Sequence, residues 1–111
     1  MSATFRVLLE MDVAPVRAAE FEAAWSEVAA SVAANPANLG QALMRDCIHP
    51  CRYQVLSDWT DEVAFRSFEQ SAEHVGHRAR LAPYRAGVVM TTMCVVAQVP
   101  GSDDGTDEWA D

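Results

Sequence analysis

The chain has 111 residues and a formal net charge of −8. This length suits one domain, and the charge argues against nucleic-acid binding, which needs clustered cations to neutralise phosphates. Hydrophobic residues make up 50% of the chain, but no apolar run approaches the ~20 residues that span a bilayer, and the N-terminus lacks the basic and hydrophobic regions of a secretory signal. We therefore expect a soluble, cytoplasmic domain with no membrane partner.

The negative charge is concentrated at the C-terminus. Residues 101–111 hold five carboxylates and no basic side chain, which leaves a charge of −3 for the rest of the chain. This segment consists largely of Gly, Asp and Ser and follows Pro100, a composition typical of disorder. We predict a folded domain over residues 1–100 and an acidic disordered tail over residues 101–111.

The first predicted elements are a strand and a helix. Residues 4–12 alternate apolar and polar side chains, the pattern of a half-buried strand. Pro15 suits the first turn of a helix, where its missing N–H would be unpaired in any case. Asn35 precedes a proline and ends the helix, because such residues avoid the helical region. Apolar residues recur at helical spacing between these points, at Phe21, Trp25, Val28 and Val32.

Two further strands and two short helices follow. The strands are predicted over residues 39–48 and 53–59, joined by a loop of hairpin length. Asp61 favours the start of the first helix, because a carboxylate there meets the positive end of the helix dipole. Ser71 is a typical N-cap for the second helix, which we place at residues 72–82.

The last predicted strand, residues 88–99, is apolar on both sides and ends at Pro100. The order β-α-β-β-α(α)-β predicts an α+β, ferredoxin-like fold, with one antiparallel four-stranded sheet and helices on one face. Soluble monomers avoid the large apolar patch that such a strand would expose. Either a second sheet packs on the uncovered face or the face lines an apolar ligand cavity, and a homodimer joined sheet to sheet would satisfy both.

Three cysteines form an odd set, which argues against the disulfide framework of a secreted protein. Cys47 and Cys51 flank His49, but a zinc site needs four ligands and the sequence offers no second cluster. We predict reduced thiols beside a hairpin loop and no metal site.

The most reactive side chains are gathered near the second short helix. His74 and His77 are three residues apart and share a helical face, and histidine suits the role of base because its ordinary pKa of ~6.5 is close to cytoplasmic pH. The alternative is that they hydrogen-bond a neighbouring loop at the surface. Arg78 and Arg85 are both suited to bind an acidic group of a ligand, such as a phenolate or carboxylate. For Arg85 the simpler interpretation is a surface ion pair with Asp58, Asp61 or Glu73.

Four segments carry a resemblance to a known family. They are NPANLGQALMRD (35–46), SDWTDEVAF (57–65), SAEHVGHR (71–78) and MTTM (90–93). With the order of the elements, they resemble the antibiotic biosynthesis monooxygenases, and within them a branch associated with aromatic polyketide gene clusters of actinomycetes. The likeness extends from Phe5 to Val99 and implies a homodimeric α+β barrel of ferredoxin-like subunits.

The resemblance implies an oxygenation without a cofactor. The polyketide enzymes of the family convert an anthrone- or naphthacenone-type carbon into a quinone with O2, using neither metal nor flavin. The substrate is the electron donor, since its carbanion can pass an electron to O2 once an acidic C–H or phenol has lost its proton. The protein must then supply a base, hydrogen-bond donors for the enolate oxygen and a dry apolar cavity.

The resemblance also suggests roles for individual residues. Trp59 matches the family's tryptophan after the third strand, and His74 stands where many members have a histidine. The polyketide oxygenases carry an asparagine and a tyrosine where this sequence has Val55 and Phe65. We therefore expect His74 to be the base, with Trp59 and Asn38 orienting or polarising the substrate carbonyl. The residues expected to bind substrate are His77, Arg78, Tyr84, Met90 and Met93.

Two other functions stay open at this point. The first is a cyclase or cyclisation helper that uses the same cavity and base without O2, which the missing asparagine and tyrosine favour. The second is a non-catalytic protein that docks on a larger tailoring enzyme through its sheet or its acidic tail.

Overall fold

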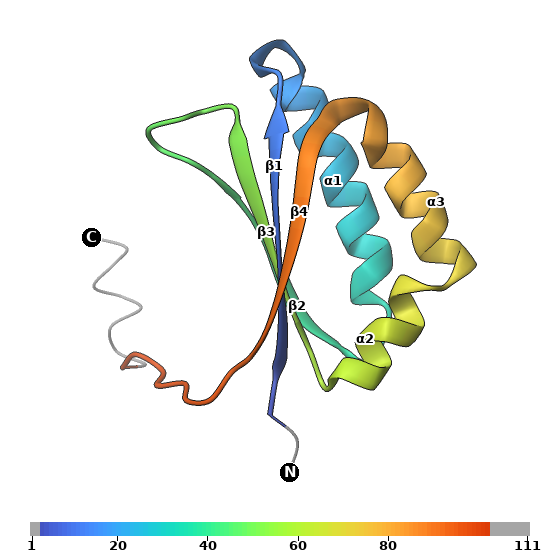
Figure 1. The fold of residues 1–111 in the computed structure, drawn as a ribbon, viewed down its shortest axis with the longest axis vertical. Coiled ribbons are helices and arrows are strands. Elements are labelled where there is room, and N and C mark those ends of the chain that lie inside the picture. Colours follow the sequence, from blue (N-terminus) through green and yellow to red (C-terminus); the bar gives the residue numbers. More distant parts are fainter. Residues whose placement is uncertain (1–2, 103–111) are drawn as a thin grey trace.

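The computed structural model describes residues 3–102 and consists of one antiparallel sheet with helices on one of its faces (Figure 1). The sheet order is β2-β3-β1-β4. Its strands are β1 (Phe5–Val13), β2 (Asn38–Arg45), β3 (Arg52–Trp59) and β4 (Arg85–Cys94). The helices are α1 (Ala18–Ala33), α2 (Glu62–Glu69) and α3 (Ala72–Leu81), with 3-10 turns at Pro15–Arg17 and Ala82–Tyr84. The predicted ferredoxin-like α+β fold is confirmed.

The central strand β1 organises the sheet, because it pairs with β3 on one side and β4 on the other. Phe5 lies opposite Trp59 in one ladder and Cys94 in the other. The alternation predicted for this strand places Val7 and Met11, exposed by only 3% and 1%, on the face that the helices cover. The core therefore lies between this face and the helices.

Two strand ends differ from the prediction for identifiable reasons. β2 ends at Arg45 rather than 48, because the Asp46 carboxylate accepts the backbone N–H groups of Ile48 and His49 at 2.7 and 2.8 Å and turns the chain. β4 begins at Arg85 rather than 88. Gly87 supplies a positive φ of 63° at the irregularity in the β1–β4 register, and this allows pairing to start earlier.

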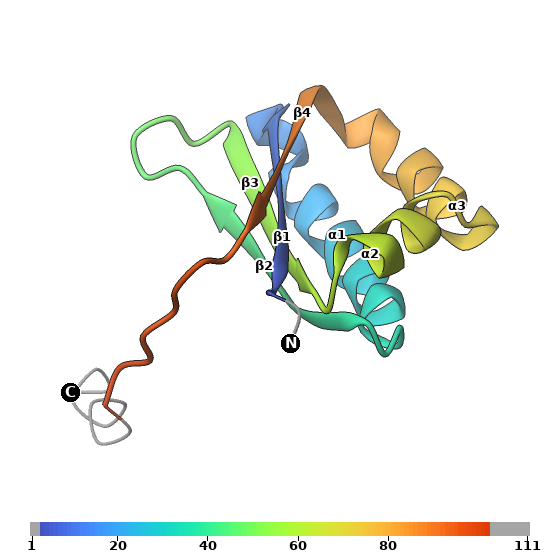
Figure 2. The ribbon, with the colours of Figure 1, turned by 60° about the horizontal axis from the view of Figure 1, so that its bottom comes forward.

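β4 also ends earlier than predicted, at Cys94 rather than 99. The last bond of this edge runs from the Val95 N–H to the carbonyl of Thr4 at 2.9 Å, just before β1 begins. With no strand beside it, the chain then leads away from the sheet (Figure 2). Most of the predicted acidic tail, from residue 103 onward, lies outside the described residues, so its disorder stays a prediction.

Side-chain caps fix the starts of the two short helices. The Asp61 carboxylate accepts the Ala64 N–H at 2.8 Å at the start of α2, and the Ser71 hydroxyl accepts the His74 N–H at 3.2 Å at the start of α3. Both residues were expected at these positions. The second cap places His74 in the first turn of α3, above the sheet.

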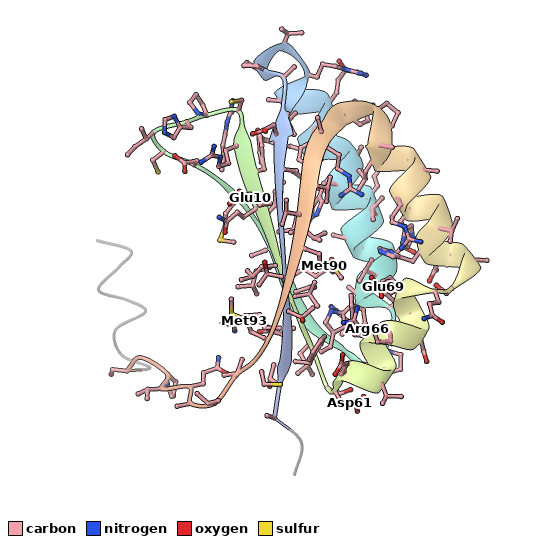
Figure 3. The ribbon with its side chains drawn as sticks, in the orientation of Figure 1. Glu10, Asp61, Arg66, Glu69, Met90 and Met93 are labelled. Atoms are coloured by element: carbon pink, nitrogen blue, oxygen red, sulfur yellow. The ribbon has the colours of Figure 1, made fainter. Side chains whose placement is uncertain are left out.

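The other face of the sheet carries no helix and is partly apolar. Val89 and Met93 of β4 are 59% and 49% exposed, and Met44 of β2 is 40% exposed. Figure 3 shows Met93 on this open side of β4 and Met90 on the side of the helices. Within residues 3–102, no helix is long and apolar enough to cross a membrane.

Candidate functional site

A cavity of about 290 Å³ lies between the covered face of the sheet and the helices. All three helices and all four strands contribute to its walls. Its lining is mainly apolar and includes Val7, Leu9, Val28, Val32, Phe68 and Met90. Two tryptophans, Trp25 and Trp59, also line it. The polar side chains in the lining are few, namely Gln41, Ser57, Glu69, His74, His77, Arg78 and Arg85. A mainly apolar cavity with a few polar groups is typical of small-molecule sites.

His74 is the central polar group of the cavity. Its ring is half-buried and lies 4.5 Å, centroid to centroid, from the ring of Phe68. Burial lowers the pKa of His74 from its ordinary value of 6.5 to about 4, and the neighbouring charge of Arg78 adds to the effect. Since burial disfavours the charged form, His74 is a neutral imidazole at neutral pH. It is therefore able to accept a proton or a hydrogen bond from a ligand.

His77 connects His74 to α1. The Nδ1 atoms of the two histidines are 3.4 Å apart, and Nε2 of His77 lies 3.1 Å from the hydroxyl of Ser31. That hydroxyl donates to the carboxylate of Glu73 at 3.2 Å. Both histidines line the cavity, so the surface-loop alternative does not describe them.

Trp59 is almost completely buried, and its indole N–H is already engaged. Its Nε1 donates to the Ser57 hydroxyl at 3.0 Å, and its ring packs against Phe65 and Phe68. Ser57 also lines the cavity. Because its oxygen accepts from Trp59, its own hydrogen remains available to a ligand. The donor in this part of the cavity is the Ser57 hydroxyl, supported by Trp59.

Arg78 and Arg85 bring positive charge to the cavity. Arg78 donates through Nη1 to the backbone carbonyl of Glu69 at 3.0 Å. Within residues 3–102, Arg85 has neither a hydrogen bond nor an ion pair through its side chain, and burial together with the charge of Arg78 lowers its pKa. A half-buried guanidinium without an anion beside it favours an anionic ligand.

The surface ion pair expected for Arg85 is not formed among the described residues. Each carboxylate considered for it has another partner. Asp58 pairs with Arg6 at 2.7 Å, Asp61 caps α2, and Glu73 accepts from Ser31.

Three residues expected in the site lie outside the cavity. The side-chain amide of Asn38 donates to the Asp58 carbonyl at 3.4 Å at the start of β2. The Tyr84 ring lies beneath the Arg17 guanidinium, 4.4 Å from centroid to Cζ, at the far end of α3. Met93 lies on the open face of the sheet (Figure 3). The cavity instead brings together Trp59, His74, His77, Arg78 and Met90.

Sequence reasoning did not identify Ser31 and Ser57 as site residues, and for Arg85 it favoured a surface ion pair over ligand binding. Ser57 shares a strand face with Trp59, and this alternation was the available signal. Ser31 carries no such signal, because it is 46 positions from His77 and meets it only through the packing of α1 and α3. Among the described residues, no group of three or more His, Cys, Asp and Glu side chains is placed to hold a metal, and Cys47, Cys51 and Cys94 are free.

Comparisons with known proteins identify a family and several structures of similar fold. The sequence model of the antibiotic biosynthesis monooxygenase family matches residues 4–80, a range that includes His74, His77 and Arg78. A candidate antibiotic biosynthesis monooxygenase from Caulobacter crescentus superposes with a TM-score of 0.78 at 26% identity, over 86% of this chain and 92% of that one. A comparison with curated proteins found no match.

Two further solved structures are similar in fold. SnoaB, a cofactor-independent oxygenase from Streptomyces nogalater, has a TM-score of 0.78 at 22% identity over 90% of this chain and 100% of that one. A candidate antibiotic biosynthesis monooxygenase from Bordetella bronchiseptica has a TM-score of 0.77 at 24% identity over 86% of this chain and 99% of that one.

The lowered pKa of His74 predicts a specific pH dependence of stability. Between pH 6.5 and about 4 the unfolded chain binds a proton on this residue that the folded chain does not. The contribution of the neutral His74 to the free energy of unfolding is therefore complete above pH 6.5 and is lost as pH falls towards 4. Urea unfolding between about pH 7 and pH 4 should show a steeper loss of stability in the wild type than in His74→Gln.

His49→Gln is the matched control, because His49 is exposed in the hairpin loop. It should follow the wild-type curve. Equal pH dependence in wild type and His74→Gln would contradict the burial effect assigned to His74.

Proposed function

The chain belongs to the antibiotic biosynthesis monooxygenase family and is a monooxygenase by that membership, and from this premise we propose that it oxidises a polycyclic aromatic polyketide without a cofactor. The substrate is of the anthrone or naphthacenone type that the actinomycete branch of the family implies. The observation that carries the proposal is a neutral histidine, His74, in an apolar cavity beside two arginines. Each part of the reaction has a counterpart among these residues.

Proton removal from the substrate is the role of His74. A base must be uncharged before it acts, and burial keeps this imidazole neutral. The proton passes from an acidic C–H or phenol to the histidine and leaves an extended carbanion. That negative charge offsets the guanidinium charges that lower the pKa of His74, so the imidazolium is easier to form with the substrate anion present than in the empty cavity.

Stabilisation of the substrate anion is the role of Arg78, Arg85 and Ser57. The guanidinium of Arg85 has no competing partner among the described residues. The Ser57 hydroxyl is oriented by Trp59 and has a hydrogen to donate to the enolate oxygen. These groups replace the donors that the family places at the positions of Val55 and Phe65.

The oxidation itself needs only O2 and the carbanion. The carbanion gives electrons to O2, one oxygen atom becomes the quinone carbonyl, and the other leaves as water with the two hydrogens of the original CH2 group. Exclusion of bulk water by the apolar walls protects the reactive intermediates. The cavity volume of about 290 Å³ is at the small end of the range for ligand sites and suits a flat molecule.

A cyclase is the second candidate function. Val55 and Phe65, at 7% and 5% exposure, are buried where the family's polyketide oxygenases carry polar side chains. A base and an anion-stabilising pair also serve an intramolecular aldol condensation, in which no O2 is consumed. The two functions differ in one measurable quantity, the uptake of O2.

We also propose that a second copy of the chain covers the open face of the sheet. Val89, Met93 and Met44 expose apolar surface there, and soluble monomers rarely leave such patches in water. Two sheets packed face to face would form the homodimeric barrel that the family resemblance implies.

The first test of the function is O2 uptake and quinone absorbance, measured with EDTA and a panel of anthrone-type aromatics. We expect uptake above the rate without protein, and a fall in kcat of about 100-fold or more in His74→Gln, because general bases typically contribute 10²–10⁴-fold. His49→Gln should retain wild-type activity. Ligand protection against heat without O2 uptake would favour the cyclase. The absence of both O2 uptake and thermal protection would contradict a polyketide cavity.

The second test concerns anion stabilisation by Arg85. Arg85→Met keeps the aliphatic stem and removes the charge, and we expect kcat to fall about 10- to 100-fold, since hydrogen bonds to charged groups contribute about 1.5–3 kcal/mol. Arg52→Met removes an exposed guanidinium near the hairpin and should have no effect. A wild-type kcat in Arg85→Met would place this side chain outside the reacting complex.

The third test concerns the assembly. Analytical ultracentrifugation of the wild type should give twice the chain mass of 12.1 kDa. Met93→Glu introduces a charge on the open face and should shift the protein to a monomer, whereas Val16→Glu changes an 88% exposed residue near the start of α1 and should not. A monomeric wild type at micromolar concentration would disprove the dimer.

A further inference from the structure

Four polar side chains form a continuous line from the cavity to the surface. His74 and His77 of α3 contact each other through Nδ1 at 3.4 Å, and Nε2 of His77 contacts the Ser31 hydroxyl of α1 at 3.1 Å. The line ends at Glu73, whose Oε2 lies 3.2 Å from the same hydroxyl. Glu73 is exposed, whereas His74 lines the cavity.

The carboxylate at the surface end fixes the direction of every hydrogen bond in this line. An ionised carboxylate only accepts, so Ser31 must donate its single hydrogen to Glu73. Glu73 lies in the first turn of α3, where the helix dipole favours a negative charge. The Ser31 oxygen is then left to accept, and Nε2 of His77 must be the donor.

The same reasoning extends to His74. A neutral imidazole carries one hydrogen, so a His77 with hydrogen on Nε2 presents a bare Nδ1. The contact between the two Nδ1 atoms then requires that His74 donates from its own Nδ1. The remaining nitrogen of His74, Nε2, is bare and has no hydrogen-bond partner among the described residues.

We infer that Ser31 and Glu73 are positioning residues that hold His74 as the tautomer with hydrogen on Nδ1, which leaves the Nε2 lone pair to a ligand. The tautomer follows from the contacts alone, whereas its use as a base rests on the function proposed above. A ring nitrogen's state is set by the hydrogen bond that its partner nitrogen makes. A histidine of the opposite tautomer would present an N–H to the substrate and accept no proton there.

The same line provides an exit for the proton. When Nε2 of His74 takes a proton from the substrate, the Nδ1 hydrogen can pass to Nδ1 of His77. The Nε2 hydrogen of His77 then passes to Ser31, and the serine hydrogen passes to the Glu73 carboxylate and on to water. Each member gains one proton and gives one up, which carries the charge out of the cavity and leaves His74 with its hydrogen on Nε2. Formation of water from O2 takes up that hydrogen from Nε2, and a proton returning along the same line in the reverse order restores the hydrogen on Nδ1 of His74.

The test is to determine the histidine tautomers by two-bond ¹⁵N–¹H NMR correlation, which distinguishes a protonated from a bare ring nitrogen. The chain has three histidines, and single His→Gln variants assign their signals. At about pH 8, above the ordinary histidine pKa of ~6.5, His74 in the wild type should carry its hydrogen on Nδ1. In Ser31→Ala and in Glu73→Gln the fraction of this tautomer should fall several-fold.

Ser26→Ala is the matched control, because Ser26 lies on the same helix and donates to the Glu22 backbone carbonyl at 3.0 Å. It should leave the His74 signals unchanged. A wild-type His74 with its hydrogen on Nε2, or a tautomer that does not respond to either variant, would overturn the inference. Backbone amide spectra show whether each variant keeps the fold.

Kinetics separate this inference from the proposed function. With an anthrone substrate, Ser31→Ala should lower kcat about 10-fold or more at unchanged KM, and Ser26→Ala should not. If the tautomer behaves as described but no aromatic substrate supports O2 uptake, the proposed reaction fails and the tautomer assignment stands. If O2 uptake is found and Ser31→Ala keeps the wild-type kcat, the role of the line in proton transfer is disproved.

Discussion

Burial of the His74 imidazole against the Phe68 ring is the interaction on which the candidate site depends. It keeps the imidazole neutral in the presence of nearby guanidiniums, as the proposed role of His74 as a base requires. It also depends on local structure, since the Ser71 cap starts α3 at the point that brings His74 over the cavity. A weaker cap than Ser71, or a smaller side chain than Phe68, would let water reach the imidazole. The pKa of His74 would then rise towards its ordinary value.

Much of the fold was predictable because local patterns and tertiary packing agree. The alternation in β1 and the carboxylate and hydroxyl caps of α2 and α3 act over a few residues, and each appears where expected. The strand ends were less predictable. β2 stops at the turn built by Asp46, and β4 stops where its partner β1 begins, so both limits are set by contacts that hydrophobic periodicity does not encode.

The site was less predictable than the fold, for a related reason. His74, His77 and Arg78 lie on one short helix, so their spacing was enough to bring them together. Asn38, Tyr84 and Met93 were chosen for their chemistry, but strand register and helix packing place them elsewhere. Ser31 is the converse case. Nothing in the sequence distinguishes this serine, and it contacts His77 only because α1 packs against α3.

The two tryptophans in the cavity wall have a consequence for how ligand binding can be observed. Trp25 and Trp59 both line the cavity, and they account for two of the chain's three tryptophans. A quinone absorbs in the near ultraviolet and visible range, so a quinone held between these indoles would quench their fluorescence by energy transfer. For the proposed quinone product, the intrinsic emission of the protein thus measures cavity occupancy without a label, and it would distinguish product held in the cavity from product released to solvent.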